Sequence, residues 1–116
     1  MLAWLFAITL AQAGQTGIAS WYHEPQNVAC PGMGKNGSNQ FDPTAMTAAM
    51  RSTKCGTKVR VTNSGNGRSV VVTINDQGPF VSGRIIDLSR AAFAEIGHLE
   101  AGTIRVTLDI LNQETP

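Results

Sequence analysis

The sequence predicts a small all-β domain in which short strands close into a barrel and one short helix packs against it. The chain has 116 residues, of which 42% are hydrophobic and 15% charged, so it has room for one core. Several short stretches are rich in β-branched residues or alternate in polarity, and one clear helix stands among them. A closed barrel is the favoured arrangement because closure leaves no unprotected strand edge.

The clearest strand lies in residues 70–80, which read Val-Val-Val-Thr-Ile-Asn-Asp-Gln-Gly-Pro-Phe. A β-branched run of this kind favours a strand over a helix, and it ends in a polar turn. Asp76 is the only ionisable side chain of this stretch, and it lies where a rigid scaffold often presents a functional group. Asp76 is therefore the first candidate catalytic residue. The alternative is an aspartate that only caps the turn.

Four further strands are expected along the chain. Their patterns are an aromatic-ended stretch, two stretches that alternate charged or polar residues with Val, Ile or Leu, and one short apolar segment. A hairpin turn, Asn-Ser-Gly-Asn-Gly, precedes the strand that ends at Asp76. The strands are expected at residues 17–22, 58–62, 84–88 and 104–111, and the hairpin turn at residues 63–67.

One helix is expected near the C-terminal end. Ser89 provides an N-cap and Gly97 a stop signal, which predicts a helix over residues 90–96. Asp42 followed by Pro43 is also a helix-start signal, so residues 44–50 are expected to form a short helix or a turn.

The first thirteen residues resemble a secretory signal. Residues 1–13 are mostly apolar and end in Ala-Gln-Ala, a small-residue cleavage pattern, and the run is too short to span a bilayer. A buried N-terminal strand or a misassigned start are the alternatives. The expected location is therefore outside the cytoplasm, in the periplasm or the medium. The net charge of +1, without a basic stripe, argues against nucleic acid or an anionic membrane surface as the main partner.

Cys30 and Cys55 fit one disulfide in an exported protein. A zinc site needs four ligands, and the sequence has no Cys-x-x-Cys spacing. Two unpaired buried thiols remain the alternative. Residues 23–40 are rich in Pro, Gly, Asn, Ser and Gln, which predicts a long loop that contains Cys30. We expect no metal and no cofactor.

A set of motifs that covers nearly all of the chain after the signal resembles the rare lipoprotein A (RlpA) family. The motifs are residues 17–22 (Gly-Ile-Ala-Ser-Trp-Tyr), 41–43 (Phe-Asp-Pro) with 46–49 (Met-Thr-Ala-Ala), 55–63 (Cys-Gly-Thr-Lys-Val-Arg-Val-Thr-Asn), 66–80 and 83–89 (Gly-Arg-Ile-Ile-Asp-Leu-Ser). The resemblance implies a six-stranded double-psi β-barrel over residues 17–112, as in expansins and barwin-like proteins. It also implies an endolytic lytic transglycosylase of peptidoglycan that prefers glycan strands stripped of stem peptides, and we expect a monomer.

The resemblance also assigns candidate functional positions. The acidic residue of the family motif falls at Asn39, the histidine falls at Met50, and the aspartate is kept as Asp76. Asn and Met cannot titrate, so Asp76 would have to serve alone as acid and then base. The alternative function is therefore a non-catalytic module that binds or loosens cell-wall polysaccharide, as expansins do.

Sugar-binding residues are expected near these positions. Asn39 and Gln40 can hydrogen-bond N-acetyl and hydroxyl groups, and Trp21 and Tyr22 can stack on sugar faces, although core packing is the alternative for one of these two aromatics. The loop residues His23 and Glu24 are possible auxiliary groups, with a solvated loop as the alternative. Asp87 is interpreted as structural, tying the barrel to the helix start through Ser89 and backbone donors.

Overall fold

The structure is a computed structural model that describes residues 14–22 and 26–111. The predicted signal and the auxiliary candidates His23 and Glu24 lie outside the described residues. The strands are β1 (Gln15–Trp21), β2 (Thr47–Ala49), β3 (Lys58–Asn63), β4 (Ser69–Asp76), β5 (Arg84–Leu88) and β6 (Thr103–Ile110). The helix is α2 (Arg90–Ile96), and two single turns of 3₁₀ helix are η1 (Lys35–Gly37) and η2 (Leu99–Ala101).

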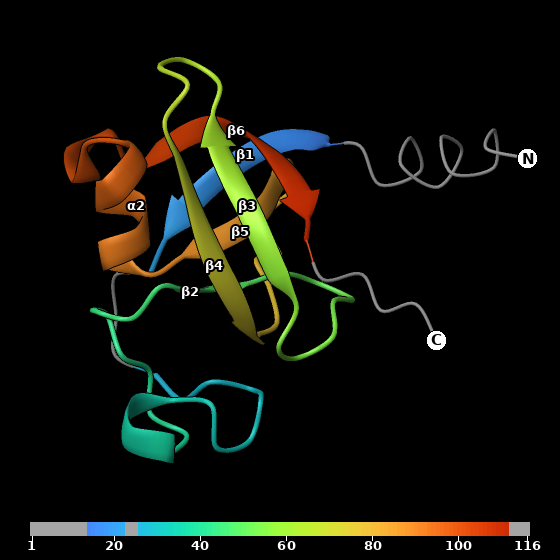
Figure 1. Cartoon of the computed structure of the whole chain (residues 1–116), viewed down its shortest axis with the longest axis vertical. Helices are drawn as coiled ribbons and strands as arrows, with labels where there is room; N and C mark the ends of the chain where they lie inside the picture. The colour runs from blue at the N-terminus through green and yellow to red at the C-terminus, as the bar shows by residue number, and fades with distance from the viewer. Residues whose placement is uncertain (1–13, 23–25, 112–116) are drawn as a thin grey trace, which may run out of the picture.

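The strands close into a barrel in the order β1-β5-β2-β4-β3-β6 (Figure 1). The pairs β1–β5 and β2–β4 are parallel, and the other four pairs are antiparallel. The loop with η1 extends away from one end of the barrel (Figure 1). The helix α2 packs against the side of the barrel. The predicted all-β barrel with a short helix is confirmed.

The barrel interior is filled by the apolar side chains that alternate along the strands. Val59 and Val61 of β3 and Val72 and Ile74 of β4 are buried. Their neighbours Arg60 of β3 and Val71 and Thr73 of β4 are exposed or half-buried. This is the period of two that a half-buried strand requires. The helix α2 adds Ala92, Phe93 and Ile96 to the same core.

The start of α2 follows the prediction. The Ser89 hydroxyl accepts a hydrogen bond from the backbone N–H of Ala92 at 3.1 Å and donates one to the carbonyl of Ala45 at 2.6 Å. Ser89 thus caps the helix and ties it to the segment before β2. Because its single hydroxyl proton goes to Ala45, Ser89 does not donate it to Asp87, and the expected link through this hydroxyl was wrong.

Residues 44–50 differ from the helical alternative. The chain turns after Asp42, whose Oδ1 accepts hydrogen bonds from the backbone N–H and hydroxyl of Thr44. The next residues form strand β2, which pairs with β4 on one side and β5 on the other. The ladder hydrogen bonds available on both sides outweigh the helical propensity of this Ala-rich segment.

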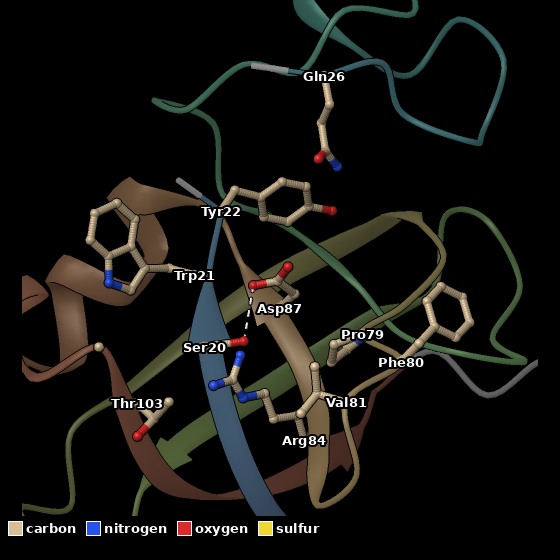
Figure 2. Close-up of a pocket in the computed structure, with 11 residues that line it drawn as sticks. Ser20, Trp21, Tyr22, Gln26, Pro79, Phe80, Val81, Arg84, Asp87 and Thr103 are labelled. Carbon is tan, nitrogen blue, oxygen red and sulfur yellow. Dashed lines mark hydrogen bonds between the residues drawn. The ribbon is translucent and has the colours of Figure 1, made fainter. Parts of the chain in front are cut away.

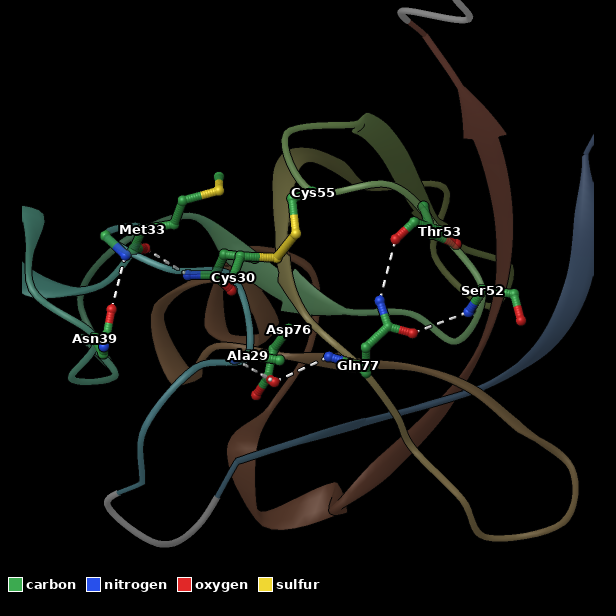
Figure 3. The surroundings of a disulfide bond; sticks show 11 residues. Ala29, Cys30, Met33, Asn39, Ser52, Thr53, Cys55, Asp76 and Gln77 are labelled. Carbon is green, nitrogen blue, oxygen red and sulfur yellow. Dashed lines mark hydrogen bonds between the residues drawn. A yellow bond between two sulfur atoms is a disulfide. The ribbon is translucent and has the colours of Figure 1, made fainter.

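The predicted disulfide between Cys30 and Cys55 is confirmed (Figure 3). It joins the long loop to the connection before β3 and closes a loop of 25 residues. In the chain-entropy model a loop of this length contributes roughly 3 kcal/mol to stability. The bond therefore fixes the loop against the end of β4, where the backbone N–H of Cys30 also bonds the carbonyl of Asn75.

Candidate active site

A groove of about 480 Å³ lies over the ends of β1 and β5 (Figure 2). Among the described residues, its lining combines one carboxylate, one guanidinium, hydroxyl and amide groups, and aromatic and aliphatic side chains. The lining residues are Ser20, Trp21, Tyr22, Gln26, Pro79, Phe80, Val81, Arg84, Asp87, Gly102 and Thr103. A groove with this mixture can hold an extended polar ligand that also has apolar faces.

Asp87 is the carboxylate among the described residues of the groove lining. It lies on β5 between Ser20 of β1 and Ala49 of β2, its partners in register. Both neighbours are small, and the side chain of Asp87 alternates with the buried Ile86 and Leu88, so its carboxylate faces the groove. The Ser20 hydroxyl donates a hydrogen bond to Oδ1 of Asp87 at 3.2 Å (Figure 2). A strand bonded on both sides therefore holds this carboxylate.

The turn between β4 and β5 forms an apolar wall of the groove. Phe80 is 76% exposed and Val81 is 53% exposed, although both are large hydrophobic residues. Gly78 begins this turn at φ 127°, a conformation that residues with a Cβ rarely adopt, so the turn requires glycine. An exposed aromatic ring beside a polar groove is suited to contact the apolar face of a ligand ring.

Asp76 lies behind the groove and not in its lining. Its side chain is 6% exposed and accepts four hydrogen bonds. Oδ1 accepts hydrogen bonds from the backbone N–H groups of Ala29 and Gln77, both at 2.9 Å. Oδ2 accepts one from the Tyr22 hydroxyl at 3.0 Å and one from Nε2 of Gln26 at 3.1 Å. Figure 3 shows the first two bonds beside the disulfide. Asp76 thus reaches the groove only through Tyr22 and Gln26.

Tyr22 is hydrogen-bonded to Asp76 and lies in the field of the Asp87 charge. Its ring is stacked on Phe41 with centroids 4.3 Å apart, and its hydroxyl donates to Asp76. Burial raises the pKa of Tyr22 far above its ordinary value, and the charge of Asp76, the hydrogen bond to Asp76 and the charge of Asp87 raise it further. Tyr22 therefore stays protonated, and it contributes a neutral hydroxyl-bearing ring to the groove lining.

We expect Tyr22 to keep its proton until the protein unfolds in alkali. It is the only tyrosine, so tyrosinate absorbance reports this group alone. In the unfolded chain Tyr22 ionises near its ordinary pKa of 10.0, whereas the folded protein retains the proton, so stability falls as the pH rises above that value. Tyrosinate absorbance should therefore rise together with the loss of circular dichroism. A titration near the ordinary value with the fold intact would contradict this environment.

The other predicted binding residues occupy two different places. Trp21 and Tyr22 line the groove, and the Trp21 indole N–H donates to the carbonyl of Leu99 at 3.1 Å while its ring packs against Phe93. Asn39 and Gln40 lie in the long loop and do not line the groove. Oδ1 of Asn39 instead accepts a hydrogen bond from the backbone N–H of Gly32 at 2.7 Å. Their sugar-binding roles stay predictions.

Met50 is a core residue. It is 5% exposed and belongs to the main hydrophobic cluster, and it does not line the groove. The residue that replaces the family histidine is therefore buried among apolar side chains. Neither this position nor Asn39 supplies a group to the groove over β1 and β5.

Of the described residues in the groove lining, only Trp21 and Tyr22 were predicted from the sequence to bind, and Asp87, Arg84 and Phe80 are among those that were missed. Two signals pointed toward them. Asp87 is a charged residue inside a short apolar strand, which is rare without a functional or paired role. Phe80 is an aromatic residue directly after a Gly-Pro turn, a position that is usually exposed.

Within the described residues, no group of three or more His, Cys, Asp or Glu side chains could hold a metal ion. The described part of the chain also has no helix long and apolar enough to cross a membrane.

The closed strand order with its two parallel pairs, together with the groove over β1 and β5, defines a double-psi β-barrel domain. Residues 14–108 match the family model described as lytic transglycolase. The chain belongs to this family. It is 48% identical over 97 residues to the probable endolytic peptidoglycan transglycosylase RlpA of Nostoc sp., covering 84% of this chain but only 26% of that protein. The chain thus spans about a quarter of that relative's length.

Solved structures show the same fold. The Streptomyces papain inhibitor superposes with a TM-score of 0.66 at 27% identity, covering 84% of this chain and 94% of that chain. A mutant of the Clavibacter michiganensis expansin, solved in complex with cellohexaose, superposes with a TM-score of 0.63 at 23% identity, covering 89% of this chain and 53% of that chain.

Proposed function

We propose that this chain is an endolytic lytic transglycosylase that cleaves peptidoglycan glycan strands freed of their stem peptides. Family membership and the curated RlpA relative support this class of activity. The observation that carries the proposal is the Asp87 carboxylate, held in an open groove between Ser20 and Ala49. The partner is the cell-wall glycan, and the protein acts outside the cytoplasm, where this glycan lies.

The reaction needs one group that gives and then takes a proton. Protonated Asp87 donates its proton to the glycosidic oxygen, and the bond from that oxygen to C1 of the muramic acid breaks. The 6-hydroxyl of the same sugar forms a new bond to C1, and its proton passes to the Asp87 carboxylate. The products are a free 4-hydroxyl and a 1,6-anhydro end, no water is consumed, and Asp87 returns to its starting state.

The remaining groove residues hold the strand. Ser20 fixes the orientation of the Asp87 carboxylate through its hydrogen bond. Phe80 and Trp21 offer ring faces to the apolar faces of the sugars. The catalytic role predicted for Asp76 stays a prediction. Its four hydrogen bonds support a positioning role, in which it holds Tyr22 and Gln26 in the groove lining.

The replacement of family groups by Asn39 and Met50 is compatible with this assignment. Neither residue lines the groove, so the absence of the family's acidic residue and histidine at these positions leaves the groove lining around Asp87 unchanged. Asp87 acting alone supplies the acid and the base in turn. The same replacements also favour the second candidate, a module that binds wall polysaccharide without cleaving it.

The test is incubation of the purified protein with peptidoglycan glycan strands from which an amidase has removed the stem peptides. We expect new 1,6-anhydromuramyl ends in the products, detected by mass spectrometry, and fewer on strands that keep their peptides. If the protein sediments with the strands but produces no new chain ends after long incubation, it is a binding module and the proposed activity is wrong.

A further inference from the structure

Arg84 shares the groove with Asp87 because of an irregularity in β5. In a regular strand two residues three positions apart point to opposite faces. The pairing of β5 with β1 shifts, however: Ile18 lies opposite Arg84, and the next residue of β1 lies opposite Ile86. Ile85 is therefore the extra residue of a β-bulge. The bulge places Arg84 on the same face as Asp87, with their Cα atoms roughly 7 Å apart along the strand.

Gly17 makes this bulge possible. A Cβ at Gly17 would lie 2.7 Å from Cγ2 of Ile85, so the side chain of the bulged residue occupies the place where a side chain at position 17 would stand. The bulge is thus supported by the neighbouring strand, and bulges of this kind often redirect a side chain beside an active site.

The charge of Arg84 has no partner inside the described structure. Arg84 is half-buried, and among the described residues it is the only Lys or Arg that lines the groove. Within residues 14–22 and 26–111, no carboxylate forms an ion pair with it, and its hydrogen bonds are those of its backbone groups. A guanidinium that is partly removed from water without an anion is costly, and its planar fork matches a carboxylate in two parallel hydrogen bonds.

A stem-peptide-free glycan strand carries such an anion next to the bond that is cut. Each muramic acid has a lactyl ether on O3, whose carboxyl group is bonded to the stem peptide and becomes a free carboxylate when the peptide is removed. The sugar that presents C1 to Asp87 therefore presents this carboxylate about one ring away. Arg84 and Asp87 line the same groove, so one muramic acid residue can contact both side chains.

We propose that Arg84 binds the free lactyl carboxylate of the muramic acid residue whose C1 faces Asp87, and so selects strands without stem peptides. This inference rests on the proposed function for the orientation of the strand. Binding itself does not require cleavage, so affinity measurements test the inference separately from turnover.

The experiment compares two ligands and three variants by isothermal titration calorimetry. The ligands are peptide-free glycan strands and the same strands after carbodiimide coupling with ammonia, which converts the lactyl carboxylates to neutral amides. The variants are Arg84→Gln, Arg84→Lys and, as a control, Arg60→Gln. Arg60 is exposed on β3 and lies outside the groove.

We expect wild-type protein to bind the carboxylate strands about tenfold or more tightly than the amidated strands. Arg84→Gln should lose this preference and bind both strands as weakly as wild type binds the amide. Arg84→Lys should keep part of the preference, and Arg60→Gln should keep all of it.

An equal loss of affinity for both strands in Arg84→Gln would overturn the inference, because Arg84 would then contact hydroxyl groups or only shape the groove. Equal binding of both strands by the wild type would also overturn it, whether or not the variants fold. A protein that shows the preference but never cleaves would instead refute the proposed activity and leave the carboxylate site standing.

Discussion

Replacement of Asp87 by Asn is expected to reduce cleavage of peptide-free glycan strands by about 100- to 10,000-fold, the usual contribution of a general acid and base. Asn occupies the same volume and can still accept the hydrogen bond from Ser20, but it cannot give up or take a proton. The loss should appear in kcat, measured from the release of 1,6-anhydromuramyl ends. The affinity for the strands should change little.

The matched control is Asp109→Asn. Asp109 lies on β6 opposite Arg60, outside the groove, so this substitution also removes one carboxylate from a barrel strand. It should leave kcat unchanged. Wild-type turnover by the Asp87→Asn protein would contradict the assignment of Asp87 as the proton donor.

Replacement of Asp76 by Ala is expected to lower the free energy of unfolding by about 3 kcal/mol. The substitution leaves the buried Tyr22 hydroxyl and the part-buried backbone N–H groups of Ala29 and Gln77 without their acceptor. A fully buried unsatisfied donor costs about 1–3 kcal/mol, and the two part-buried donors cost less because water can reach them. The change should appear as a lower denaturant midpoint. Asp76→Asn should cost less, because the amide oxygen still accepts hydrogen bonds.

The outcome separates the two roles considered for Asp76. A positioning residue loses stability, and cleavage falls only as far as the folded population and the placement of Tyr22 are affected. If Asp76→Asn were as stable as wild type and yet stopped cleavage as completely as Asp87→Asn, Asp76 would be catalytic, as the sequence alone predicted.

The polarity pattern of the sequence was sufficient to predict most strands of the barrel. β3 and β4 were recognisable from the alternation of polar and apolar residues and from the Asn-Gly hairpin, because one face of each strand is buried and the other is exposed. Strand β2 was missed, since three residues are too few for a period to show. Its strand conformation comes from pairing with β4 and β5, which are distant in the sequence.

The site was less predictable because it depends on which carboxylate the fold leaves accessible. Asp76 and Asp87 both follow buried strand residues, and Ala49 pairs with each of them, on opposite sides of β2. The sequence does not show that the loop folds back to give Asp76 donors such as the backbone N–H of Ala29. It also does not show the bulge at Ile85, which is visible only in the register with β1 and places Arg84 beside Asp87.

The most direct test of the role of Asp87 is cleavage of peptide-free glycan strands in isotopically labelled water. Attack by the sugar's own 6-hydroxyl consumes no water, so we expect every new end to be a 1,6-anhydro end without label, and we expect such ends to form about 100- to 10,000-fold more slowly with Asp87→Asn. Labelled reducing ends would show a hydrolase, and no new ends at all would show a binding module. Either result would contradict the role assigned to Asp87 in this groove.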